Sequence, residues 1–376
     1  YDGFNSVRRC RSAREHLLCG LQDVLEHVLT PLGREKKPLL AHVLRLEQAH
    51  FDGFLFDMLT LLRESEDLFA HPHVAGHLAR CISLVLSAIT TPFIARTAPD
   101  ESSRHILLHD LDFLLALPSR SLATSGLALR ADLYSAILKL QQYLTLRRGV
   151  AQDVEEVLAR HRAELFRVAV TDFSSRSLGP EKALGDECAS KAAALAIIQV
   201  LLPKSSPQLL AMGSSASIRG LVVHHSLVLH LTDDFEPGAE GTQLGEVLDV
   251  TKTEDKQPLL LIFTGKMAVL LHLAQNPEGL RELGCCRTIH RLARSRYLVS
   301  HVESEQHLRA LIRPHTGGPH SAGILSKRFH LLLLPTLRLF LMLLHDVTEG
   351  RQITEPALEF FWAHRVLVRE VLRVGA

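Results

Sequence analysis

The stretch from 258 to 284 constrains the fold of this chain more than any other part of the sequence. Between Leu259 and Ala274 the only strongly polar residues are Lys266 and His272. A helix that is apolar on nearly every side must be buried by neighbouring helices or by lipid. This one is interrupted by Lys266 and is shorter than the roughly 20 apolar residues that a membrane span needs. The sequence therefore predicts a central helix of a helical stack and no transmembrane segment.

A tight corner is expected directly after this helix. Asn276 is a suitable N-cap, Pro277 fits the first position of a new helix, and Gly284 is suited to close it. These residues predict a short second helix that packs back on the first. Lys266, the polar residue of the long helix, is expected to reach solvent or a carboxylate on a neighbouring helix.

The composition favours an all-α chain and excludes two kinds of partner. Hydrophobic residues make up 47% and charged residues 22%, as in ordinary folded proteins. One Trp, four Tyr and few β-branched runs argue against a β-sandwich. Lys and Arg number 42 against 41 Asp and Glu, so the net charge of +1 gives no field that attracts nucleic acid or an anionic membrane. We expect no direct nucleic-acid partner.

Helical periodicity recurs along the whole chain. It predicts helices at 15–29, 38–62, 73–89, 104–117, 127–146, 150–170, 181–202, 217–231, 258–275, 277–284, 285–294, 303–312, 325–344 and 353–373. An acidic, glycine-containing loop is expected at 233–257. No fixed repeat length occurs. Successive antiparallel helix pairs fit an irregular α-solenoid of the HEAT or armadillo kind over residues 1–376, and a closed helical bundle of several subdomains is the alternative.

The cysteines favour free thiols over disulfides. The chain has six, none in a CxxC pair, and Cys285 and Cys286 are adjacent. Buried thiols in a reducing compartment are the simplest interpretation. Because the sequence begins at Tyr1 instead of Met, we expect a segment of a longer protein.

Two histidine patterns are compatible with metal binding. His73, His77 and Cys81 are spaced four residues apart, so they fall on one helical face, as zinc ligands can. No fourth ligand is marked, and a chain with 22 His contains such spacings by coincidence. We therefore favour ordinary core or surface roles for these three residues.

A second pattern, His105, His109-Asp110 and Asp112, resembles the ligands of all-helical metal phosphohydrolases. That chemistry needs a further His and a distant Asp, and the surrounding residues are simply amphipathic. We favour a non-enzymatic chain without catalytic residues, resident metal or cofactor.

Two other features suggest ligand binding but have simpler explanations. Gly265-Lys266 resembles the end of a phosphate-binding loop, but Met267 replaces the required Ser or Thr and no strand precedes it. A basic stripe formed by Arg287, His290, Arg291 and Arg294 is suited to phosphate or acidic partners, although a solvated outer face is the favoured alternative.

The aromatic residues near the C-terminus are the best candidates for partner binding. Phe340 precedes a last helix that contains Phe360, Phe361 and Trp362. Three successive residues on a helix cannot all point the same way, so at least one should lie near the surface. We predict that these four aromatics bind a partner helix, with inward packing of all of them as the alternative.

Four segments of the chain resemble, in order and spacing, the C-terminal region of the largest inner-ring scaffold nucleoporins of the nuclear pore complex. The first has Arg130-Ala131 and Leu133-Tyr134, and the second has Lys266-Met267-Ala268 within 263–279. The third is the Phe-His-Leu-Leu-Leu-Leu-Pro run at 329–335, and the fourth is 358–364. Thr264-Gly265 departs from the charged pair that is more frequent in that family, which leaves the sister scaffold of the same ring open.

The resemblance implies a structural role at the nuclear envelope. By it, the chain is the C-terminal part of an α-solenoid that supports nucleocytoplasmic transport. Its implied partners are a short helical segment of a linker nucleoporin and other inner-ring nucleoporins. The alternative is an armadillo or HEAT adaptor for peptide cargo, which would need rows of Asn and Trp where this chain has a single Trp.

Overall fold

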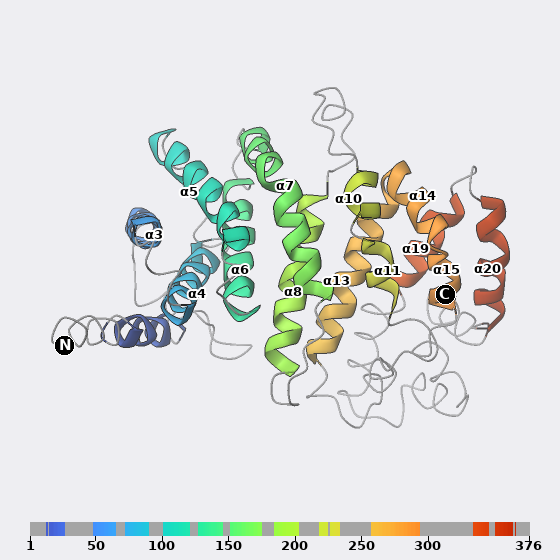
Figure 1. Ribbon diagram of the computed structural model, residues 1–376, viewed down its shortest axis with the longest axis horizontal. Coiled ribbons are helices and arrows are strands. Elements are labelled where there is room, and N and C mark those ends of the chain that lie inside the picture. Colours follow the sequence, from blue (N-terminus) through green and yellow to red (C-terminus); the bar gives the residue numbers. More distant parts are fainter. Residues whose placement is uncertain are drawn as a thin grey trace, which may run out of the picture. The chain divides into compact units, whose positions relative to one another are not determined.

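The computed structural model describes residues 13, 15–26, 48–64, 72–89, 101–120, 127–145, 151–174, 184–202, 218–224, 226–233, 257–293, 334–345, 350–363 and 365 (Figure 1). These residues form helices and the short turns between them, and none of them lies in a strand. The all-α prediction is confirmed. Across these same ranges, no helix combines the length and the apolar character that crossing a membrane requires.

The chain divides into two compact units, residues 1–173 and 174–376. Inside each unit, helices pack on several nearby helices without a regular repeat, as in an irregular solenoid. The first unit contains helical residues 15–26 and five labelled helices: α3 (Gln48–Glu64), α4 (Pro72–Ile89), α5 (Glu101–Arg120), α6 (Leu127–Thr145) and α7 (Ala151–Ser174).

The core of the first unit lies between α4 and α6, which share its most extensive helix contact. Leu78 and Ile82 of α4, one turn apart, are fully buried, as are Leu133 and Ile137 of α6. This spacing of four residues puts one apolar face on each helix. Helices α3 and α5 complete the unit by packing on α4 and α6, respectively.

The second unit is organised around α13 (Gln257–Ala274), the predicted central helix. The other helices of this unit are α8 (Leu184–Leu201), α10 (Ile218–His224), α11 (Leu227–Thr232), α14 (Pro277–Cys285), α15 (Thr288–Ala293), α19 (Leu334–His345) and α20 (Gly350–Ala363). Helix α13 contacts α8, α11, α14 and α19, and Phe263, Met267 and Leu270 are buried among them. The prediction of a buried helix is confirmed.

Helices α8 and α13 approach each other closely at Gly265. A Cβ atom at this position would lie 3.0 Å from Leu195 Cδ1 and 3.2 Å from Leu195 Cβ. The glycine therefore has a packing role. Lys266 beside it is only 3% exposed and has a partner inside the protein. Of the two predicted alternatives for Lys266, exposure to solvent is wrong, because α13 is covered by neighbours on this side as well, and a carboxylate partner stays a prediction.

The corner after α13 is where it was predicted, but its hydrogen bonds differ. Asn276 occupies the N-cap position of α14 and Pro277 begins the helix. The Asn276 side chain does not cap α14, because its Nδ2 donates to the carbonyl of His272 at 3.3 Å. Helix α14 also continues through Gly284 to Cys285, so Gly284 does not close it. The positive φ of 52° after this helix belongs to Arg287.

Prolines and a residue of positive φ explain how three predicted helices begin, end or divide. Helix α5 continues through Pro118 to Arg120, because a proline in the last turn removes a single helical hydrogen bond. The helix predicted at 217–231 is divided into α10 and α11 at Ser226, whose φ is 51°. Helix α19 spans Leu334–His345, in agreement with a helix that starts at Pro335, and residues 325–333 of the predicted helix lie outside the described residues. Most of the predicted acidic loop and the helix at 303–312 fall outside the described residues.

Candidate partner-binding site

The candidate site is on α20, which packs against α15 and α19. Ala357 and Phe360 lie on its inner face and are buried. Glu355, Leu358, Glu359, Trp362 and Arg365 are exposed. Their spacing of three, four, seven and ten residues places them on one side of the helix. Helix α20 therefore has an inner face against its neighbours and an outer face toward solvent.

Three of the four predicted aromatics form a cluster between α19 and α20. The rings of Phe340 and Phe360 are stacked with centroids 4.1 Å apart. Phe361 lies edge-on to Phe360 at 5.6 Å and is tilted against Phe340 at 6.3 Å. Phe340 and Phe360 are both buried, so a partner cannot touch them without unpacking the unit. Their role is to hold α20 on α19.

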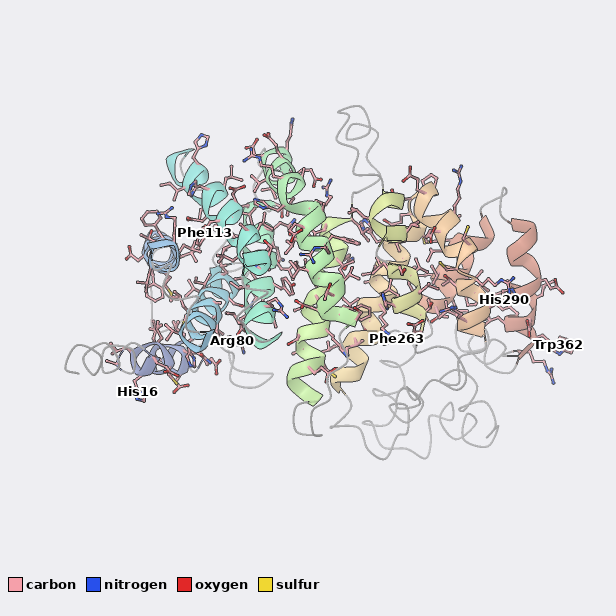
Figure 2. All side chains as sticks on the ribbon, viewed as in Figure 1. His16, Arg80, Phe113, Phe263, His290 and Trp362 are labelled. Carbon is pink, nitrogen blue, oxygen red and sulfur yellow. The ribbon has the colours of Figure 1, made fainter. Side chains whose placement is uncertain are left out.

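Trp362 is the predicted aromatic that reaches the surface. It is 72% exposed, and Figure 2 shows its side chain projecting from α20 away from the neighbouring helices of the unit. The prediction that at least one of three successive aromatics lies near the surface is thus confirmed. The guanidinium group of Arg365 covers part of one face of the indole ring, with its carbon 4.9 Å from the ring centroid. This is a cation–π contact, which orients the ring.

Leu358 completes an apolar ridge that the sequence analysis did not single out. It lies one turn before Trp362 and is 63% exposed. The two side chains are four residues apart, so they lie one above the other on the helix surface. The four-residue spacing of Leu358 and Trp362 is visible in the sequence, but the sequence does not show that both side chains face solvent. We call Leu358 and Trp362 the α20 ridge.

The residues flanking the α20 ridge are charged. Glu355 and Glu359 lie beside it, also one turn apart, and Arg365 lies beyond Trp362. A large exposed Leu and Trp with charged neighbours is the pattern of a protein-interaction surface: an apolar centre and a polar rim. A second exposed leucine, Leu341 at 68%, lies on α19 next to the buried Phe340.

The first histidine pattern has ordinary structural contacts. His77 Nδ1 lies 2.7 Å from Gln22 Oε1, and the Cys81 thiol donates a weak hydrogen bond to the carbonyl of Leu18 at 4.0 Å. Both residues thus attach helical residues 15–26 to α4. The placed part of the chain contains no group of three His, Cys, Asp or Glu side chains arranged to hold a metal ion.

The second histidine pattern is likewise occupied by ion pairs. Asp110 is buried and its Oδ1 lies 3.4 Å from Arg63 Nη1, while Asp112 Oδ1 lies 3.0 Å from His161 Nε2. Asp110 and Asp112 therefore point toward different partners, on α3 and α7. Burial raises the pKa of Asp110 against the opposing effects of Arg63 and His109.

The basic stripe near α15 is only partly available. Arg291 Nη1 lies 3.1 Å from Thr232 Oγ1 and 3.4 Å from Asp233 Oδ1, so this side chain joins α15 to the end of α11. Arg287 is exposed, and Arg294 lies outside the described residues. Lys266 is buried and Gly265 is half-buried, and both lie within α13 and not in a loop. Among the residues that the structure describes, neither feature forms a phosphate site.

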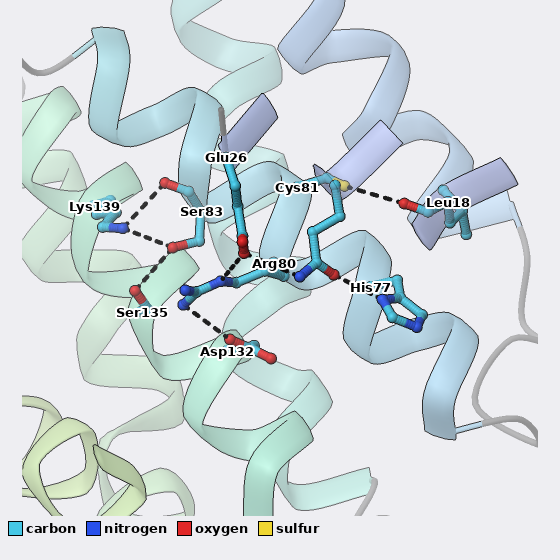
Figure 3. A network of polar contacts seen from close by, with 10 residues as sticks. Leu18, Glu26, His77, Arg80, Cys81, Ser83, Asp132, Ser135 and Lys139 are labelled. Carbon is cyan, nitrogen blue, oxygen red and sulfur yellow. Dashed lines mark hydrogen bonds and ion pairs between the residues drawn. The ribbon is translucent and has the colours of Figure 1, made fainter. Parts of the chain in front are cut away.

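A polar network of the first unit joins three helices around Arg80 (Figure 3). Arg80 lies 3.4 Å from Glu26 Oε1 and 3.7 Å from Asp132 Oδ1. Lys139 donates to the hydroxyl and the carbonyl of Ser83 at 2.7 and 3.1 Å. Burial raises the pKa of Asp132 to about 6 despite Arg80, and burial lowers the pKa of Lys139.

This network resembles a structural junction more than a reactive site. Its groups pair with one another across helical residues 15–26, α4 and α6, and each carboxylate is directed at Arg80. Comparison with protein-family models, with curated proteins and with solved structures gives no match to this chain. The function is therefore inferred from the residues themselves, and the α20 ridge places two large exposed apolar side chains side by side on one helix.

Proposed function

We propose that this chain is a non-enzymatic scaffold that captures an amphipathic helix of a partner protein on the α20 ridge. In its most specific form, the chain is a C-terminal segment of an inner-ring nucleoporin scaffold. The partner is then a helical segment of a linker nucleoporin, and the location is the nuclear pore complex at the nuclear envelope. Its contribution to nucleocytoplasmic transport is structural.

One observation carries the binding role: Leu358 and Trp362 are 63% and 72% exposed on the outer face of a helix whose inner face is packed. Burying a leucine and a tryptophan side chain against a partner contributes a few kcal/mol. Tryptophan is also enriched among the residues that dominate binding energies. An amphipathic helix laid along α20 covers both residues at once, since they are one turn apart.

The resemblance to nucleoporins bears on the architecture of the chain more than on this site. Arg130 and Tyr134, from the first matching segment, are buried and bonded to Asp172. Lys266 and Met267, from the second, are buried in α13. Such residues belong to the packing of helices, which a scaffold family shares. The resemblance to nucleoporins therefore lies at core positions in these two segments, whereas the binding proposal depends on surface positions.

A binding titration tests the site. The full chain is titrated with a fluorescent peptide covering an amphipathic helix of a linker nucleoporin. We expect Trp362→Asp or Leu358→Asp to weaken the affinity at least about tenfold, equivalent to about 1.4 kcal/mol. Leu261→Asp is the matched control, because Leu261 is a 59% exposed leucine on α13, outside the ridge. If both variants bind the peptide with wild-type affinity, the binding site does not lie on α20.

A separate measurement tests the nucleoporin assignment. The chain, expressed with a tag in cells that carry a nuclear envelope, is expected to concentrate at nuclear pores and to co-purify with inner-ring components. If the tagged chain is distributed uniformly in the cell but still binds a different amphipathic helix, the scaffold role stands and the location at nuclear pores is rejected.

A further inference from the structure

Helical residues 15–26 contact α4 through side chains and a backbone carbonyl on one side of the helix. The half-buried side of this helix includes Leu18, Cys19, Gln22 and Glu26, while Leu17, Gly20 and Val24 face outward. Gln22 contacts His77 and Glu26 contacts Arg80 (Figure 3). These polar contacts are part-buried or exposed, and the apolar side chains of Leu18, Leu21 and Leu25 on the same helix are half-buried.

Two cysteines come together in this interface. Cys81 is fully buried on α4, and its sulfur lies 4.0 Å from the carbonyl oxygen of Leu18, the residue before Cys19. In a planar trans peptide that oxygen lies about 3 Å from the Cα atom of the next residue. Cys81 Sγ is therefore within about 7 Å of the Cys19 Cα atom. The two residues are also close enough for Cys19 to raise the pKa of the Cys81 thiol.

We infer that Cys19 and Cys81 form a reversible disulfide that locks helical residues 15–26 onto α4 when a small-molecule disulfide such as oxidised glutathione is present. Bridged cysteines have Cα atoms about 4.4–6.8 Å apart. Because the bound of about 7 Å runs from the Cys81 sulfur to the Cys19 Cα atom, closing the bridge requires rotation of both side chains and a shift of helical residues 15–26 toward α4. Both cysteines are free thiols in the structure.

The disulfide forms in two steps of thiol–disulfide exchange with oxidised glutathione. Cys19, the half-buried thiol, attacks one sulfur of oxidised glutathione as a thiolate and releases one glutathione thiol. The Cys81 thiolate then attacks the Cys19 sulfur and releases the second. The protein loses two protons and two electrons, the oxidant gains both, and one intramolecular disulfide replaces the disulfide of glutathione.

The order of the steps follows from accessibility and acidity. Cys81 has no exposed surface, so the oxidant meets Cys19 first. Burial raises the pKa of the Cys81 thiol to about 12, so only a small fraction is thiolate at neutral pH. The second step is therefore the slow one, and its rate should rise about tenfold for each pH unit between pH 7 and 9.

Mass spectrometry of the full chain tests the disulfide. After incubation with oxidised glutathione and alkylation of the remaining thiols, we expect a peptide pair linked through Cys19 and Cys81. Cys81→Ser should stop at a glutathione adduct on Cys19, and Cys19→Ser should leave Cys81 unmodified. Cys286→Ser is the matched control, because Cys286 is a partly buried thiol with a pKa also raised to about 12, by burial and Glu282. It should leave the link unchanged.

Hydrogen exchange reports the structural effect. Oxidation of the wild-type chain should slow amide exchange in residues 15–26 by about tenfold or more, and a reductant should restore the original rate. Cys81→Ser should show no slowing. A stable glutathione adduct on Cys19 in the wild-type chain, a link from Cys19 to any other cysteine, or unchanged exchange after oxidation would each overturn the inference.

Discussion

Arg130 on α6 and Asp172 on α7 form a buried ion pair, with Arg130 Nε 2.7 Å from Asp172 Oδ2. The hydroxyl of Tyr134 donates to the same carboxylate oxygen, also at 2.7 Å. Burial, followed by the charge of Asp172, raises the pKa of Tyr134, so its hydroxyl stays protonated and remains a donor. The three side chains together fix α6 against α7.

Breaking this pair should destabilise the first unit strongly. In Asp172→Ala the guanidinium of Arg130 stays buried without its carboxylate, and we expect a loss of about 3–5 kcal/mol in the free energy of unfolding. Urea unfolding, followed by hydrogen exchange on α6 and α7, measures it. Arg167→Ala removes the exposed pair with Glu164 on the same helix and should cost less than about 0.5 kcal/mol. Equal losses in the two variants would contradict this ranking.

The corner between α13 and α14 should not accept a methyl group at Gly279. A Cβ atom there would lie 2.4 Å from the carbonyl oxygen of Leu273, which is backbone and cannot move aside. We expect Gly279→Ala to lower the melting temperature, at a cost of about 1–3 kcal/mol or more.

The matched control for this variant is Gly220→Ala. Gly220 lies within α10 and a Cβ atom added there has nothing within 4 Å. Alanine favours helix over glycine by about 1 kcal/mol, so this variant should be neutral or more stable than the wild type. Destabilisation by both substitutions would show that the contact with Leu273 is not the cause.

Asp132 should make the stability of the first unit depend on pH. Burial raises its folded pKa from 3.8 to about 6, which favours the protonated folded form. The stabilisation from its proton is complete below about pH 4 and is lost as the pH rises through 6. Relative to Asp132→Asn, the wild type should lose at most about 3 kcal/mol between pH 4 and 7.

Chemical unfolding of both proteins across this pH range measures the effect. Arg80, Lys139, His77 and Glu26 face the same carboxyl group and are present in both proteins. Their own contributions therefore cancel in the difference to a first approximation. A wild type that instead loses stability relative to Asp132→Asn as the pH falls would mean that the Arg80 ion pair outweighs burial.

Substitutions of buried and exposed aromatics on α20 should have different effects, with the first lowering stability and the second weakening partner binding. Phe360→Ala removes a fully buried ring stacked on Phe340 and should cost about 3–5 kcal/mol of stability. Trp362→Ala removes an exposed ring and should leave the unfolding midpoint nearly unchanged while weakening peptide binding. Thermal unfolding and the peptide titration, performed on both variants, give the two readouts. A large stability loss in Trp362→Ala would place that residue in the core.

Local features of the fold were predictable from the sequence. Apolar residues at helical spacing predicted α4, α6, α7 and α13 to within a few residues, because this periodicity depends on the chain alone. Pro277 predicted the start of α14 for the same reason: its fixed φ and missing N–H suit the first helical position. Boundaries were less predictable at Pro118, which is tolerated in the last turn of α5, and at Ser226, whose positive φ divides α10 from α11.

The candidate site was only partly predictable. The sequence placed Phe360, Phe361 and Trp362 on different sides of one helix, since successive residues are about 100° apart. It did not say which of them faces out, nor that Leu358 joins Trp362. That was decided by α15 and α19, which cover the side of Phe360 and leave the opposite side uncovered. Similarly, the apolar character of α13 predicted burial, but only the contact with α8 explains Gly265 and only the surrounding helices bury Lys266. Helix formation is a local property of this chain, whereas the exposure of each face depends on residues distant in the sequence.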